Sequence, residues 1–204
     1  MRPRWRGRLH AFGAAATLPV GAQLAIAARG AAAVWASAVF VVTAFAVYAV
    51  SASYHLLART KRAQAVMQRM DHAAIFFLIA GSATPLCVLA LSPWAATALL
   101  VMIWGGAAVG ATLKARGRAD RAAKALYLIV GWSVIAVLPA VWNETGIAAG
   151  LIVGGGLIYT AGAVAFSKQW PRARCAVFGY HEVWHSATLI AGALHFAAVT
   201  KLVS

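Results

Sequence analysis

The chain has 204 residues, of which 63% are hydrophobic and only 11% are charged, and its mean hydropathy is +0.79. This composition lies outside the range of ordinary water-soluble domains, so it excludes a soluble enzyme and indicates an all-α integral membrane protein. The net charge of +14 would suggest nucleic-acid binding in a soluble protein, but here the basic residues flank apolar segments, and we expect no nucleic-acid partner.

Long stretches without Asp, Glu, Lys or Arg follow one another along the chain. Each can cross the ~30 Å hydrocarbon core of a bilayer as a helix. The longest stretch, from His72 to Leu113, is divided by Ser92-Pro93 into two spans. The sequence therefore predicts one membrane domain over residues 1–204, a seven-transmembrane helix bundle with approximate spans at 11–28, 32–57, 71–91, 94–113, 124–142, 146–166 and 178–200.

The first span could also be taken for a signal peptide, because an Arg-rich start precedes an apolar stretch. Pro19 and Gln23 interrupt that stretch, and no soluble domain follows it, so we expect the span to be kept. Its removal would leave six helices in the same orientation.

The basic residues are distributed unequally between the two ends of these spans. Only Arg29 and Lys201 fall at one end. The other end carries the remaining basic residues: Arg2, Arg4, Arg6, Arg8, Arg59, Lys61, Arg62, Arg69, Lys114, Arg116, Arg118, Arg121, Lys124, Lys168, Arg172 and Arg174. The positive-inside rule therefore predicts a multi-pass protein of the cell membrane with a cytoplasmic N-terminus and an external C-terminus. Membrane lipids, including anionic headgroups, are its expected partners.

Polar side chains gather near the predicted cytoplasmic boundary of the second and third spans. His55 lies one turn before Arg59, where the second helix leaves the membrane, and Ser51 lies one turn deeper on the same face. Asp71 starts the third span, two residues after Arg69. These three side chains are therefore expected at one depth.

The last span carries two histidines at helical spacing. His181 and His185 are four residues apart, so both can bind one metal ion from the same helix face. His195 lies about 15 Å further along the axis and cannot join them. A third ligand is expected from the cytoplasmic end of another helix, and His55 fulfils that condition. Three neutral imidazoles with an open position are typical of a catalytic Zn²⁺ site, in which Ser51 and Asp71 could hold a metal-bound water and Asp71 could deprotonate it.

Other interpretations exist for some of these residues. His181 to His185 also match the H-E-x-x-H pattern of zinc proteases, which would make Glu182 the general base and Asp71 a ligand. Alternatively, Glu182 could lie beside Arg172 or Arg174 in the preceding loop. We interpret His10, His72 and His195 as residues of the membrane interface.

Four segments together resemble the hemolysin III family, the bacterial branch of the progestin and adiponectin receptor superfamily. They are residues 6–10 (RGRLH), 51–55 (SASYH), 70–75 (MDHAAI) with 80–85 (AGSATP), and 181–185 (HEVWH). The resemblance implies seven helices with a cytoplasmic N-terminus. It also implies zinc bound near the cytoplasmic side by His55, His181 and His185, with Asp71 and Ser51 around the zinc water. Adiponectin receptors resemble lipid amide hydrolases with ceramidase activity, and the superfamily includes alkaline ceramidases.

Three functional hypotheses follow. The first is a zinc-dependent membrane hydrolase that acts through a zinc-bound water on a lipid amide, with the substrate entering from the bilayer. The second is a non-enzymatic sensor or regulator of membrane state, in which zinc joins helices two and seven. The third, suggested by the family's name, is a pore-forming haemolysin, but the spans carry few polar stripes that could line a channel. No segment indicates a particular oligomeric state.

Overall fold

The computed structural model describes residues 3–117, 120–172 and 177–203. These residues are almost entirely helical, and no strand occurs among them. Within these ranges, 7 helical segments are long and apolar enough to cross a membrane. The all-α, seven-span membrane fold expected from the sequence is therefore confirmed.

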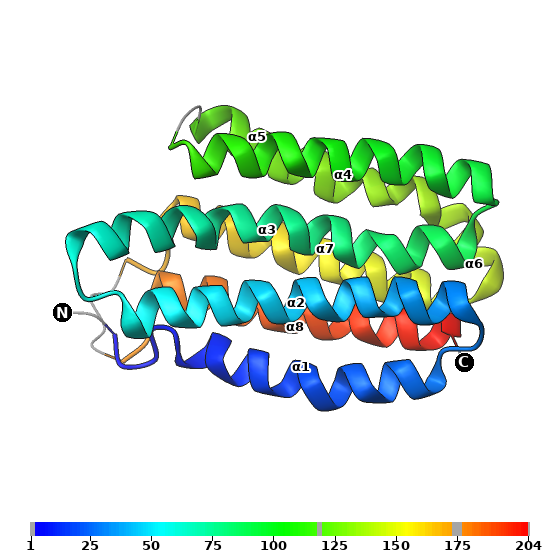
Figure 1. The fold of residues 1–204 in the computed structure, drawn as a ribbon, viewed down its shortest axis with the longest axis horizontal. Helices are drawn as coiled ribbons and strands as arrows, with labels where there is room; N and C mark the ends of the chain where they lie inside the picture. The colour runs from blue at the N-terminus through cyan, green and yellow to red at the C-terminus, as the bar shows by residue number, and fades with distance from the viewer. Residues whose placement is uncertain (1–2, 118–119, 173–176, 204) are drawn as a thin grey trace.

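Figure 1 shows the order of the elements along the bundle. They are α1 (Arg8–Ala27), α2 (Ala31–Leu57), α3 (Lys61–Ala90), α4 (Pro93–Ala115), α5 (Asp120–Trp132), the 3₁₀ helix η1 (Ser133–Val137), α6 (Leu138–Glu144), α7 (Gly146–Ser167) and α8 (Tyr180–Val203). The segment α5–η1–α6 together forms the fifth span.

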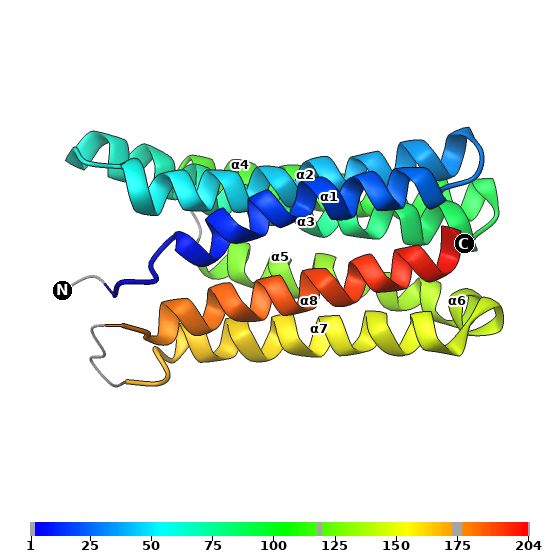
Figure 2. The ribbon, with the colours of Figure 1, turned by 90° about the horizontal axis from the view of Figure 1, so that it is seen from below.

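The helices form two layers. Figure 2 shows α1, α2, α3 and α4 in one layer and α5, α6, α7 and α8 in the other. Helix α3 packs against α2 and α4 within its layer and also contacts α5, α6 and α8 across the bundle. The two marked chain ends lie at opposite ends of the bundle (Figures 1 and 2), as an odd number of spans requires.

Helix α3 begins ten residues before the span that the sequence predicts at 71–91. Thr60 is its N-cap, and the Thr60 side chain accepts a hydrogen bond from the backbone N–H of Ala63 at 3.1 Å. The apolar stretch marks where the bilayer begins, whereas the cap marks where the helix begins. Asp71 therefore lies inside a continuous helix, and not at its first turn.

The sequence predicted one regular helical span at 124–142, but the fifth span of the structure is not one regular α-helix. It contains the five-residue 3₁₀ segment η1, followed by α6, which has Pro139 in its first turn. Proline has no backbone N–H and cannot continue an α-helical hydrogen-bond ladder, so the helix changes its winding just before it.

Aromatic and small residues bring the helices together in the core. The fully buried Phe76 of α3 occupies the space that a Cβ at Gly110 of α4 would need, and its ring stacks on Tyr127 of α5 at 4.1 Å. Phe40 of α2 stacks on Phe196 of α8 at 4.3 Å. Because lipid tails are as apolar as these side chains, such close packing is what favours helix association in a membrane.

The alternation of helix directions brings distant parts of the chain to one end of the bundle. The start of α1, the end of α2 and the start of α8 all lie at the end marked N in Figures 1 and 2. The predicted cytoplasmic boundary residues therefore share one end. Of the basic residues used to predict the orientation, Arg2, Arg118 and Arg174 lie outside the described ranges.

The orientation of the bundle can be tested with reporter fusions. If the end with the excess of Arg and Lys faces the cytoplasm, alkaline phosphatase fused after Ser204 should be active, and a green fluorescent protein at the same position should be dark. The same reporters fused within residues 116–119 should give the opposite result. A fluorescent C-terminal fusion would contradict the predicted orientation.

Candidate metal centre

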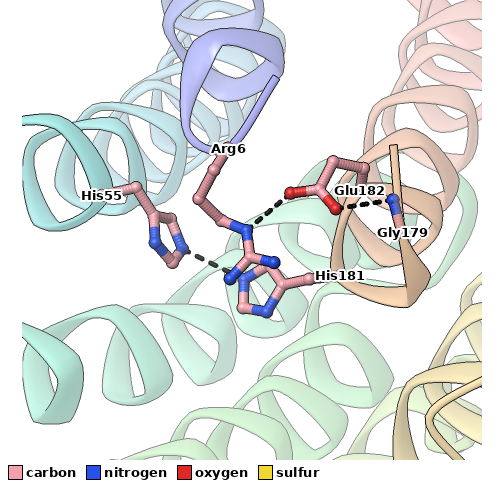
Figure 3. A network of polar contacts seen from close by, with 5 residues as sticks. All are labelled: Arg6, His55, Gly179, His181 and Glu182. Carbon is pink, nitrogen blue, oxygen red and sulfur yellow. Dashed lines mark hydrogen bonds and ion pairs between the residues drawn. The ribbon is translucent and has the colours of Figure 1, made fainter. Parts of the chain in front are cut away.

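Three imidazoles from α2 and α8 meet at the N-terminal end of the bundle. His55 lies in the last turn of α2, while His181 and His185 lie in the first two turns of α8. The Nε2 atoms of His55 and His181 are 3.1 Å apart (Figure 3). One nitrogen from each of the three rings lies within 4.8 Å of the other two. The three residues that the sequence predicts as ligands are thus brought together across 126 residues of sequence.

The rings are held by one another and by an aromatic neighbour. The ring centroid of His181 lies 4.7 Å from the ring centroid of His55 and 4.7 Å from that of His185. The ring centroids of His55 and His185 are 5.1 Å apart. Phe166 of α7 places its ring edge-on to His181, with 5.2 Å between the centroids. The three imidazoles therefore converge without lying parallel, as separate ligands of one ion do.

The arrangement could hold a metal ion. Two nitrogens bound tetrahedrally to an ion such as zinc at ~2.0–2.1 Å lie roughly 3.3 Å apart, close to the separation of His55 and His181, whereas the set of three nitrogens spans up to 4.8 Å. His185 is only 1% exposed, and its Nδ1 has no hydrogen-bond partner among the described residues. His55 and His181 are half-buried, so the cluster has a more accessible side. The donor set suits a metal ion with an open coordination position.

Asp71 of α3 lies beside Ser51 of α2. The Ser51 hydroxyl has no hydrogen-bond partner of standard geometry among the described residues. Both residues are buried, with Asp71 8% exposed. Ser51 lies one helical turn from His55 on the same face of α2. The structure therefore groups the three predicted ligands, while Asp71 lies beside Ser51, a residue of the helix that carries His55.

A fourth imidazole beside the cluster was not identified from the sequence. His10, expected at the membrane interface, is 4% exposed, and its ring stacks on His185 at 3.8 Å with 7° between the planes. Its Nε2 lies 2.9 Å from Oγ1 of Thr188, whose hydroxyl donates to the carbonyl of His185. The interfacial interpretation of His10 was wrong, because the start of α1 packs against α8.

The described residues give Glu182 a partner that the sequence did not indicate. It is fully buried and accepts hydrogen bonds from Arg6 Nε at 2.5 Å and from the backbone N–H of Gly179 at 2.9 Å (Figure 3). Its partner is thus Arg6, not Arg172, while Arg174 lies outside the described residues. Both carboxylate oxygens are engaged, which argues against the general-base role of the H-E-x-x-H pattern.

Of the remaining two histidines, His195 lies apart from the cluster and His72 lies near His181. His195 is buried, with Nε2 3.4 Å from the carbonyl of Ile152, so its expected interfacial position was also wrong. His72 is half-buried, and its backbone carbonyl accepts a hydrogen bond from the Tyr127 hydroxyl at 2.6 Å. An apolar helix gives no local signal for which neighbour will cover such a residue.

The sequence of the chain is similar to those of known membrane proteins. The sequence model of the family described as Haemolysin-III related matches residues 1–196. The chain is 33% identical to Hemolysin-3 of Bacillus cereus over 93% of its length and 86% of the relative's. It is 28% identical to a Hemolysin-3 homolog of Bacillus subtilis (93% and 89% covered) and 34% identical to the heptahelical transmembrane protein ADIPOR2 of Oryza sativa (83% and 82% covered).

Metal analysis tests whether the cluster binds an ion. We expect purified protein to contain about one zinc ion per chain, and the triple variant His55→Ala, His181→Ala, His185→Ala to contain almost none, because it lacks every imidazole donor of the cluster. Elemental analysis by mass spectrometry measures this ratio. His195→Gln, which removes a buried histidine of the same helix outside the cluster, should keep the metal. Equal zinc in the triple variant and the wild type would contradict the assignment.

Proposed function

The chain belongs to the haemolysin-III-related family, and we propose that it is a zinc-dependent membrane hydrolase that cleaves a lipid amide. The observation that carries this proposal is the convergence of three imidazole nitrogens within 4.8 Å of one another at one end of a membrane bundle. Ionisable groups are rare inside membrane spans and commonly mark functional sites. The lipid as a substrate class rests on the resemblance of the four sequence segments to the adiponectin receptor superfamily, and the similarity to the heptahelical transmembrane protein ADIPOR2 agrees with that resemblance.

His55, His181 and His185 would hold the zinc ion. A bound zinc ion supplies Lewis acidity, which polarises a carbonyl group and makes water a stronger acid near neutral pH. The half-buried sides of His55 and His181 leave an approach to the cluster at the end of the bundle. There, the polar part of a lipid can reach the imidazoles while its acyl chain stays in the bilayer.

Asp71 is the group suited to moving protons. In amide hydrolysis, water adds to the acyl carbon, the C–N bond breaks, and the leaving nitrogen must gain a proton. Asp71 can accept the proton from the attacking water and return it to that nitrogen. Asp71 lies beside Ser51, which is one helical turn from His55 on α2, so a small movement could bring the carboxylate into reach of the cluster.

Turnover of defined lipids tests the proposed activity. Zinc-loaded protein in liposomes should release free fatty acid from ceramides or other N-acyl lipids, and chelation should abolish the release until zinc is returned. Mass spectrometry of the acid and amine products measures the reaction. If chelation lowers only the melting temperature, and the loaded protein cleaves no lipid of a broad panel, the cluster is a structural zinc site that joins α2 and α8.

Substitution of Asp71 separates proton transfer from metal binding. Asp71→Asn should lower kcat by about 10²- to 10⁴-fold, the usual contribution of a general acid–base group, while the zinc content stays unchanged. Glu182→Gln, assayed with zinc in excess, should lower kcat much less than Asp71→Asn does, because the Glu182 carboxylate is engaged by Arg6 and Gly179 and is not free to take up a proton. The reverse pattern would support a protease-type role for Glu182 instead.

A further inference from the structure

The segment that leads into α1 contacts every element of the histidine cluster. We call Arg6, Gly7 and His10 the N-terminal clamp. Arg6 pairs with Glu182, which lies between the two histidines of α8, Gly7 lies against His55, and His10 stacks on His185. The backbone N–H of Trp5 also donates to the carbonyl of Val177, just before α8, at 3.4 Å.

The Arg6–Glu182 pair fixes the first turn of α8. Glu182 is 0% exposed, and a buried carboxylate without a partner is strongly destabilising. One carboxylate oxygen accepts from Arg6 and the other from the N–H of Gly179, so the side chain joins α1 to the beginning of α8 (Figure 3). Because His181 and His185 lie on the turns next to Glu182, this pair restrains the position of both imidazoles.

Gly7 brings the same segment onto α2. Its φ is +81°, a left-handed conformation that side chains rarely adopt, and a Cβ built there would lie 2.7 Å from Cβ of His55. Only glycine permits this close approach. The backbone just before α1 therefore rests directly on the residue that supplies the third imidazole.

His10 supports the remaining imidazole from the side. The Thr188 hydroxyl donates its one hydrogen to the carbonyl of His185. In its contact with His10 the hydroxyl must therefore be the acceptor, and Nε2 of His10 must carry the hydrogen. This bond holds the His10 ring parallel to His185. His10 thus fixes the plane of the His185 ring.

Helix α1 joins the two helices that carry the predicted metal ligands. Helix α1 packs more extensively against α2 and against α8 than α2 and α8 pack against each other. The placement of His55 relative to His181 and His185 therefore depends on α1 together with α3, which also contacts both α2 and α8. We propose that Arg6, Gly7 and His10 are positioning residues, which set the geometry of the metal centre by joining the helices that carry its ligands. This inference rests on the metal centre of the proposed function, but not on hydrolysis.

A metal titration tests the clamp. Arg6→Gln should weaken metal binding by about 10- to 100-fold, as loss of outer partners of metal ligands usually does. The probe is Co²⁺ added to chelator-treated full-length protein, with its visible absorption as the readout. Arg8→Gln is the matched control, because it removes one positive charge from an exposed position of the same segment. Its affinity should equal that of the wild type.

The absorption spectrum separates positioning from general destabilisation. Metal-saturated Arg6→Gln should show an altered Co²⁺ band even at temperatures well below its own melting temperature, where a variant that is only less stable would keep the wild-type band, and Arg6→Lys should restore part of the wild-type band. If Arg6→Gln does not fold, His10→Phe decides instead, because it keeps a ring against His185 and loses only the bond to Thr188. An altered band in that variant supports the clamp, and an unaltered band overturns it.

The wild-type arm of the same titration distinguishes the two proposals. If the wild type binds Co²⁺ and Arg6→Gln binds it equally well with the same spectrum, the clamp is overturned while the proposed function stands. If the wild type binds Co²⁺ and the clamp variants weaken it, but no lipid is cleaved, only the hydrolase proposal fails. A wild type that binds no metal overturns both.

Discussion

The structure depends on one constraint, which is that ionisable side chains placed within membrane helices need partners from other helices. His55, His181 and His185 satisfy this requirement among themselves at one end of the bundle, and Glu182 satisfies it with Arg6. A helix on its own cannot supply such partners, and its ionisable groups would then face lipid. The polar groups therefore determine which helix ends lie together, while close packing of apolar side chains fills the remaining contacts.

The first helix has a larger role than its sequence suggests. It is the least apolar of the first four spans, and its start is rich in arginine. In the fold, residues at that start contact both the end of α2 and the start of α8, two helices that pack little against each other along their lengths. The proposed metal centre thus has ligands from two helices and its supporting contacts from a third. This division resembles other metal sites, in which partners of the ligands control geometry and affinity.

The same arrangement suits chemistry at a membrane boundary. The cluster lies at the end of the bundle, where the polar part of a lipid is found, and not at its centre. Asp71 and Ser51 lie on the neighbouring helices α3 and α2, and both are buried. A site of this kind can act on the headgroup linkage of a lipid that remains in the bilayer, which agrees with the proposed hydrolase and with membership of a family of multi-pass membrane proteins.

Sequence alone determined the number of spans and the ligand candidates, because bilayer thickness sets the length of an apolar helix and histidines at i and i+4 share a face. It could not reveal where α3 begins or that η1 interrupts the fifth span, since these depend on a cap and a proline inside otherwise apolar or basic stretches. It also missed His10 and the true partner of Glu182. Only the tertiary structure decided these, because apolar helices of similar composition give no local signal for which faces will meet.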